Sequence, residues 1–179
     1  KQDIIVAHSG FISIYKNEES TGSLTGSSFP NRVDLTVTGT PFAIDVTDVD
    51  MDGLPDIIGY MNTGNNVSIF RNRSYGTNVI SAQSFAPAVT FAANAAPLGG
   101  KFGDFDKDGR PDIAMASNST AFVGVYRNIC TPGVINFAPK VDLSMVNTNN
   151  KDPFVADIDE DGWQDIAIGR DNGNIILFR

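Results

Sequence analysis

The chain contains one cysteine, one histidine and one tryptophan, and it has fewer basic than acidic residues. The single cysteine, Cys130, excludes a disulfide bond within the chain. Thirteen basic and 21 acidic residues give a formal net charge of −8. This balance argues against nucleic acid as a partner, because phosphate binding needs a basic surface.

Long apolar runs and helical periodicity are also missing. No run of 18 apolar residues is present, so we expect no insertion into a membrane. No stretch keeps apolar residues at helical spacing for three turns, and glycine and proline recur throughout. The chain starts within a repeated pattern and shows no leader, so we expect that any leader was removed or that the chain belongs to a longer one. These features favour an all-β protein.

Residues for acid–base or nucleophilic catalysis are scarce. His8 has no catalytic partner that the sequence reveals, and we interpret it as a turn or groove residue. Cys130 lies in an expected loop, and only His8 could pair with it, so a nucleophilic role is disfavoured. Outside the acidic segments described next, no acid–base pair is clustered. We therefore expect that this chain is not an enzyme.

Three similar acidic segments are the main feature of the sequence: DVDMDGLPDII (48–58), DFDKDGRPDIA (104–114) and DIDEDGWQDIA (157–167). Each contains the pattern D-x-D-x-D-G-x-x-D and ends in an apolar run. Their twelve aspartates are more than half of the 21 acidic residues, and three divalent cations would change the formal charge from −8 to −2. The acidity therefore indicates metal sites rather than a solvated acidic face.

The acidic segments mark a longer repeat. Their last aspartates, Asp56, Asp112 and Asp165, are 56 and 53 residues apart, and a further step of 53 towards the N-terminus reaches Asp3. Asp3 would end a fourth copy whose acidic loop would precede residue 1. A second marker is an aromatic residue followed by a cation, with the ring expected between repeats and the cation at the surface. The four pairs are Tyr15-Lys16, Phe70-Arg71, Tyr126-Arg127 and Phe178-Arg179.

Each repeat is predicted to form four short strands. A third marker, FPNRVDL, FAPAVTF or FAPKVDL, starts at Phe29, Phe85 and Phe137 and precedes the strand that leads to the next acidic loop. Four strands per unit of about 50 residues are typical of a β-propeller blade, with a β-solenoid as the alternative. We predict an incomplete propeller of roughly 14 strands in about four blades, two complete and two partial. The blade units are 1–40, 41–96, 97–150 and 151–179.

The acidic pattern itself predicts a cation site. Carboxylates at positions 1, 3, 5 and 9 and a main-chain carbonyl at position 7 make an all-oxygen shell, which suits Ca²⁺ better than Mg²⁺. An EF-hand begins in the same way but needs glutamate at position 12, where this chain has Gly59, Met115 and Ile168. Acidic turns without a metal are the alternative, although close carboxylates repel one another without a cation.

These segments resemble the calcium loops of FG-GAP repeats, also called VCBS repeats, which form integrin-alpha-like propellers. The segment KFGDFDKDGRPDIAMA (101–116) is the most similar, whereas the Phe-Gly pair is replaced by Phe42-Ala43 and Phe154-Val155 in the other copies. The resemblance covers about three and a half repeats and implies about three structural Ca²⁺ ions per chain. By position it implies the ligands Asp48, Asp50, Asp52, Leu54 and Asp56; Asp104, Asp106, Asp108, Arg110 and Asp112; and Asp157, Asp159, Asp161, Trp163 and Asp165, where Leu54, Arg110 and Trp163 contribute carbonyl oxygens.

The resemblance also implies a function. We expect a secreted or cell-surface module that binds a protein or carbohydrate ligand, as in cell adhesion. Specificity would lie in the variable loops 18–28, 74–84 and 147–151, which show no recognisable motif. Alternatives are a non-catalytic accessory region of a larger secreted enzyme and a structural spacer of a cell-surface protein. An open arc of blades could also self-associate through its exposed sheet edges.

Overall fold

The computed structural model of the chain describes residues 1–20, 22–76, 79–145, 148 and 150–179. In these residues 14 strands form four antiparallel sheets, and the only helical segments are the short 3₁₀ turns η1 (Gly26–Ser28) and η2 (Ala82–Ser84). Within the same residues no helix is long and apolar enough to cross a membrane. The prediction of an all-β protein is confirmed.

Each sheet is a meander of consecutive strands, with four strands in the second and third sheets and three in the first and fourth. The strands of sheet 1 are β1 (Ile4–His8), β2 (Phe11–Lys16) and β3 (Asn31–Thr36); those of sheet 2 are β4 (Pro41–Thr47), β5 (Asp56–Met61), β6 (Asn66–Phe70) and β7 (Val89–Ala92); those of sheet 3 are β8 (Pro97–Gly103), β9 (Asp112–Ser117), β10 (Phe122–Tyr126) and β11 (Val141–Ser144); and those of sheet 4 are β12 (Asn150–Ala156), β13 (Asp165–Arg170) and β14 (Ile175–Phe178). The predicted two complete and two partial blades correspond to these sheets. Residues 21, 77–78, 147 and 149 of the predicted binding loops lie outside the described residues.

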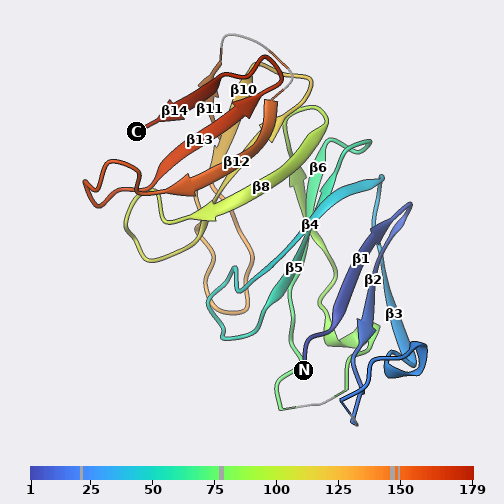
Figure 1. Ribbon diagram of the computed structural model, residues 1–179. Helices are drawn as coiled ribbons and strands as arrows, with labels where there is room; N and C mark the ends of the chain where they lie inside the picture. Colours follow the sequence, from blue (N-terminus) through green and yellow to red (C-terminus); the bar gives the residue numbers. More distant parts are fainter. Residues whose placement is uncertain (21, 77–78, 146–147, 149) are drawn as a thin grey trace.

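The four sheets follow one another in chain order, from β1–β3 near the N-terminus to β12–β14 near the C-terminus (Figure 1). Strand β8 lies against both β4 and β12, and β4 also lies against β1. The first strands of sheets 2, 3 and 4 are therefore neighbours along one side of the array. This arrangement is that of successive blades around an axis.

Apolar side chains fill the spaces between neighbouring sheets. Strands β5 and β9 are buried at every position, since each has a neighbouring sheet on both faces. One core cluster joins sheets 1 and 2, a second joins sheets 2 and 3 through residues such as Ile58 and Met115, and a third joins sheets 3 and 4. Burial of one such aliphatic side chain stabilises the fold by about 1.5–3 kcal/mol. Face-to-face packing of consecutive sheets makes them propeller-like blades.

Two glycines in strands allow this close packing. A Cβ atom on Gly100 of β8 would lie 2.8 Å from the hydroxyl oxygen of Tyr60, which is fully buried between sheets 2 and 3. A Cβ atom on Gly59 of β5 would lie 2.7 Å from Cδ1 of Ile12 in sheet 1. Glycine normally weakens a strand, so its presence here reflects the close approach of the neighbouring blade.

Candidate metal centres

Each acidic segment forms the loop between the first and second strands of its sheet. Loop 1 (48–56) joins β4 to β5, loop 2 (104–112) joins β8 to β9, and loop 3 (157–165) joins β12 to β13. The fourth residue of each loop has a left-handed backbone, with φ of 59° at Met51, 57° at Lys107 and 60° at Glu160. Positive φ is uncommon for such residues. Its recurrence at one position shows that the three loops share a backbone conformation.

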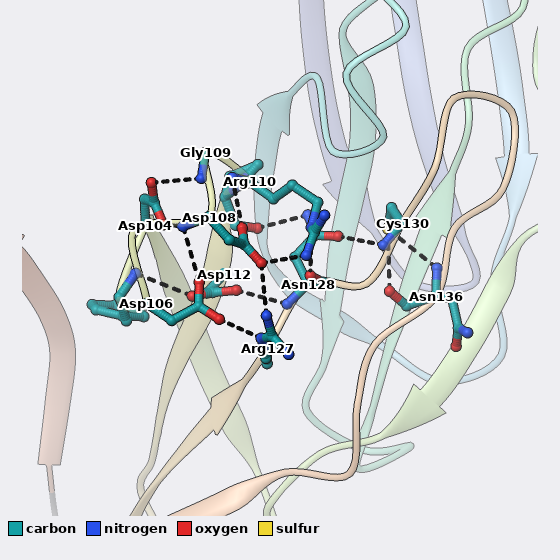
Figure 2. Close-up of polar contacts among 12 residues, drawn as sticks. Asp104, Asp106, Asp108, Gly109, Arg110, Asp112, Arg127, Asn128, Cys130 and Asn136 are labelled. Carbon is teal, nitrogen blue, oxygen red and sulfur yellow. Dashed lines mark hydrogen bonds and ion pairs between the residues drawn. The ribbon is translucent and has the colours of Figure 1, made fainter.

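The first and last aspartates organise each loop through backbone hydrogen bonds. In loop 2, the Asp104 carboxylate accepts the N–H groups of Asp108 at 3.0 Å and Gly109 at 2.9 Å (Figure 2). The Asp112 carboxylate accepts the N–H of Phe105 at 3.0 Å. The equivalent acceptors are Asp48 and Asp56 in loop 1 and Asp157 and Asp165 in loop 3. The aspartates therefore form the turn as well as the acidic cluster.

Three aspartates in each loop bring carboxylate oxygens together, within 4.8 Å of one another. Two oxygens bound to one Ca²⁺ at about 2.3–2.6 Å can be at most about 5 Å apart, so each cluster fits one shared ion. Hard carboxylate donors also favour calcium over softer metals. The clusters are Asp48, Asp50 and Asp56; Asp104, Asp106 and Asp108; and Asp157, Asp159 and Asp165.

Nine of the twelve predicted carboxylate ligands therefore converge, and Asp52, Asp112 and Asp161 lie outside these clusters. Asp52 and Asp161 each accept the N–H of the residue two positions later, Leu54 at 2.9 Å and Trp163 at 2.8 Å. Metal ligation by these three aspartates and by the carbonyls of Leu54, Arg110 and Trp163 stays a prediction.

The ninth loop residue is buried in all three copies, as Asp56, Asp112 and Asp165 show. The pKa of Asp56 is raised to about 6, chiefly by burial and to a smaller extent by the nearby carboxylates of Asp50 and Asp52, against the opposing effect of hydrogen bonds from backbone N–H groups. Burial likewise raises the pKa of Asp112. A divalent cation beside these groups would favour their ionised forms and act in the opposite direction.

An asparagine follows three of the four aromatic–cation pairs and contacts the ninth aspartate or its equivalent, a contact that the sequence did not indicate. The N–H of Asn72 donates to the Asp56 carboxylate at 2.8 Å, and its side chain donates to the Pro55 carbonyl at 3.0 Å. Asn128 makes both equivalent bonds in sheet 3. In sheet 1 the N–H of Asn17 donates to Asp3 at 2.8 Å, so Asp3 occupies the position expected from the repeat.

The arginines of the last three pairs also reach the acidic loops of their own sheets, whereas Lys16 of the first pair is paired with Glu18. Arg71 donates through Nε to Asp50 at 2.7 Å and through Nη2 to Asp52 at 2.9 Å. Arg127 pairs with Asp106 and Asp108 in the same way (Figure 2), and Arg179 reaches Asp159 at 3.3 Å. The expected surface position is confirmed for Arg127 and Arg179, whose side chains are 53% and 66% exposed. It is wrong for Arg71, which is 19% exposed. These arginines follow the ninth aspartates by 15, 15 and 14 residues, and this nearly constant offset was the available signal.

Neighbouring blades contact the acidic loops. The N–H of Gly133 in sheet 3's connecting loop donates to Asp50 Oδ2 at 2.7 Å. The Asn128 side chain donates to the Val49 carbonyl at 2.9 Å. Lys107 Nζ of loop 2 lies 3.9 Å from the ring centroid of Trp163 in loop 3, a cation–π contact. Loop 1 is therefore bound to sheet 3, and loop 2 contacts loop 3.

His8 has a partner that the sequence did not reveal. Its Nε2 lies 2.6 Å from Ser13 Oγ, and Ser13 donates to Asp34 at 2.5 Å. The hydrogen bond from Ser13, and then that from Arg32, lowers the pKa of Asp34. This order differs from that of a catalytic triad, in which the carboxylate orients the histidine and the serine is free to attack. Ser13 is also fully buried, so the cluster is structural.

Cys130 is equally unsuited to nucleophilic attack. The residue is buried, and its sulfur accepts the N–H of Asn136 at 3.1 Å (Figure 2). Burial raises the pKa of the Cys130 thiol to about 11, while that hydrogen bond opposes the shift. The thiol is therefore protonated at neutral pH, in agreement with the interpretation from the sequence.

The fold and the loops together define a class: a repeat protein of propeller-like blades, three of which carry an acidic loop between their first two strands. The model of the FG-GAP-like repeat family matches residues 48–115 and 104–168. These matches together span 121 of the 179 residues, and each begins at the first aspartate of an acidic loop. The chain therefore belongs to the FG-GAP-like repeat family. A search of curated proteins found no match.

Proposed function

We propose that this chain is a calcium-binding β-propeller module of a secreted or cell-surface protein, and that it binds a protein or carbohydrate ligand. The observation that supports it best is the recurrence of one metal-compatible geometry. All three acidic loops share the left-handed fourth residue, and each gathers three carboxylates with oxygens within 4.8 Å of one another. Membership of the FG-GAP-like repeat family is consistent with this proposal.

The proposed role of calcium is structural. The ninth aspartate of each loop starts the second strand of its sheet, whereas the first aspartate follows the first strand. In loops 1 and 3, where the first and ninth aspartates belong to one cluster, an ion held between them would join the two strands and remove the repulsion among the carboxylates. Its binding free energy would then add to the free energy of unfolding.

We also propose that the chain has no catalytic role. Two of its candidate nucleophiles, Ser13 and Cys130, are buried, and the single histidine is bound to Ser13. The aspartate clusters accept hydrogen bonds from their own loops, as a structural site would. An accessory region of a larger enzyme and a structural spacer remain the alternatives that the ligand test below separates.

Native mass spectrometry of the chain in calcium, and again after chelation, tests the metal proposal. We expect three bound Ca²⁺ ions per chain, all lost to the chelator, and weaker retention of Mg²⁺. A matched variant, Asp104→Asn with Asp106→Asn, should bind one ion fewer, because it removes two of the three clustered carboxylates of loop 2. Absence of bound calcium in the unmodified chain would overturn the assignment. The same spectra give the oligomeric state.

Binding of the calcium-loaded chain to arrays of glycans and of extracellular proteins tests the second part. We expect a ligand whose binding weakens in chelator, because the loops between strands lose their support. Binding to no array member would favour the structural spacer. A catalytic sequence fused to this region would favour the accessory role.

A further inference from the structure

The most enclosed ion pair among the described residues joins Arg71 to acidic loop 1. The side chains of Asp50 and Asp52 are 0% and 2% exposed, and that of Arg71 is 19% exposed. Gly133 of the next blade donates its N–H to the same Asp50 oxygen that Arg71 binds. The pair is therefore covered by chain on several sides.

The buried carboxylates of Asp50 and Asp52 need a positively charged partner. Removing water from a carboxylate is costly, and an isolated buried carboxylate is among the most unfavourable groups in a protein. Arg71 supplies a positive charge that is permanent, because guanidinium is not deprotonated in proteins. Its planar fork contacts two carboxylates at once, through Nε at 2.7 Å and Nη2 at 2.9 Å.

We propose that Arg71 is an internal counter-cation of loop 1, a positioning residue that holds Asp50 and Asp52 and replaces part of the stabilisation that a metal ion would supply. Loop 1 is then the acidic loop that depends least on calcium. Loop 2 depends on it more, because Arg127 makes the equivalent contacts but is 53% exposed. The comparison with calcium rests on the proposed function, whereas the stabilising role of Arg71 does not.

Thermal unfolding of Arg71→Met in chelator and in calcium tests this proposal, with Arg127→Met as the matched control. Arg127 pairs with the equivalent aspartates of loop 2 but is 53% exposed. In chelator we expect Arg71→Met to lower the Tm by roughly 5–15 °C, as expected for a broken buried pair. The exposed pair of Arg127 should change it by less than about 3 °C. Calcium should raise the Tm of Arg71→Met more than that of the unmodified chain.

Arg71→Lys provides a second variant in case Arg71→Met does not fold in chelator. Lysine retains the charge but not the fork, so we expect a Tm between those of the unmodified chain and Arg71→Met. Equal Tm values for Arg71→Met and Arg127→Met in chelator would overturn the proposal, as would a calcium-induced rise no larger than that of the unmodified chain. If native mass spectrometry shows no bound calcium, the proposed function fails, and the comparison in chelator still decides the role of Arg71.

Discussion

Loop 1 and loop 3 have the same pattern of aspartates and the same backbone, yet their surroundings differ. In loop 1 the clustered residues Asp50 and Asp56 are buried, whereas in loop 3 only the ninth residue, Asp165, is buried. The arginine that faces loop 1 is 19% exposed and makes two contacts, and the one that faces loop 3 is 66% exposed and makes one. Identical local chemistry is therefore placed in two different electrostatic environments.

The next blade encloses loop 1. The connecting loop of sheet 3 covers loop 1 and donates to it from Gly133 and Asn128. Within the described parts of the chain, no hydrogen bond from another sheet reaches loop 3. The comparison shows that contacts with a neighbouring blade, rather than the loop sequence, determine how far an acidic loop is exposed to solvent. Four sets of variants test how far this difference extends through the structure.

The largest expected loss in the free energy of unfolding comes from a substitution in the apolar core between sheets 2 and 3, which also contains Val49 of loop 1. Ile58 of β5 is fully buried between sheets 2 and 3, whereas Ile175 of β14 in sheet 4 is 75% exposed. Ile58→Ala should lower the free energy of unfolding by about 3 kcal/mol, through lost burial and a residual cavity. Ile175→Ala should change it by less than about 0.5 kcal/mol. Urea unfolding in calcium measures both changes. Equal losses in the free energy of unfolding would contradict the expected difference between the two blades.

Alanine substitution of two glycines in strands should give the next largest difference in stability. Gly100→Ala would place a Cβ 2.8 Å from the Tyr60 hydroxyl, whereas Gly169→Ala in β13 would meet only the Lys151 side chain at 3.9 Å. We expect a loss of about 1–3 kcal/mol for Gly100→Ala, because the buried ring must move. Gly169→Ala should be close to neutral. A stable Gly100→Ala protein in urea unfolding would mean that the blades separate easily.

Replacement of one aspartate by asparagine should destabilise loop 1 more than loop 3. Asp56 accepts two backbone N–H groups, from Val49 at 3.0 Å and Asn72 at 2.8 Å. Asparagine has one acceptor oxygen, so Asp56→Asn leaves one buried donor unpaired and should cost about 1–2 kcal/mol in chelator. Asp159→Asn removes only an exposed pair with Arg179 and should cost less than about 0.5 kcal/mol. Chemical unfolding in chelator gives both values, and a larger cost for Asp159→Asn would reverse the comparison.

The smallest expected effect concerns the contact between loops 2 and 3. Lys107→Ala removes a cation 3.9 Å from the Trp163 ring centroid and should cost about 0.5 kcal/mol. Because Trp163 is the only tryptophan, its fluorescence reports on the surroundings of this ring. We expect a shift in emission for Lys107→Ala and none for Lys151→Ala, whose lysine pairs with Asp171 instead. An unchanged spectrum for Lys107→Ala would show that the two loops are independent.

Much of the architecture could be predicted from the sequence, because its signals are local. The four strands predicted for each complete repeat, for example, are observed in sheets 2 and 3, and the repeat markers led to the correct number of strands. The enclosure of Arg71 and the close contact of Gly100 with Tyr60 could not be predicted, since both depend on a neighbouring blade. The partner of His8 was missed for a similar reason, because a hairpin and a third strand bring Ser13 and Asp34 to it.

The sequence by itself determined the repeat, the order of strands and the conformation of the acidic loops. A run of aspartates with glycine at the sixth position forms its turn from hydrogen bonds within nine residues, so no distant contact is needed. Only the tertiary structure decided which loop is enclosed. Asp50 and Gly133 are 83 residues apart in the chain, and they meet because apolar faces of successive sheets pack together. Burial is a property of that packing, and it encloses the arginine of loop 1 more than that of loop 2.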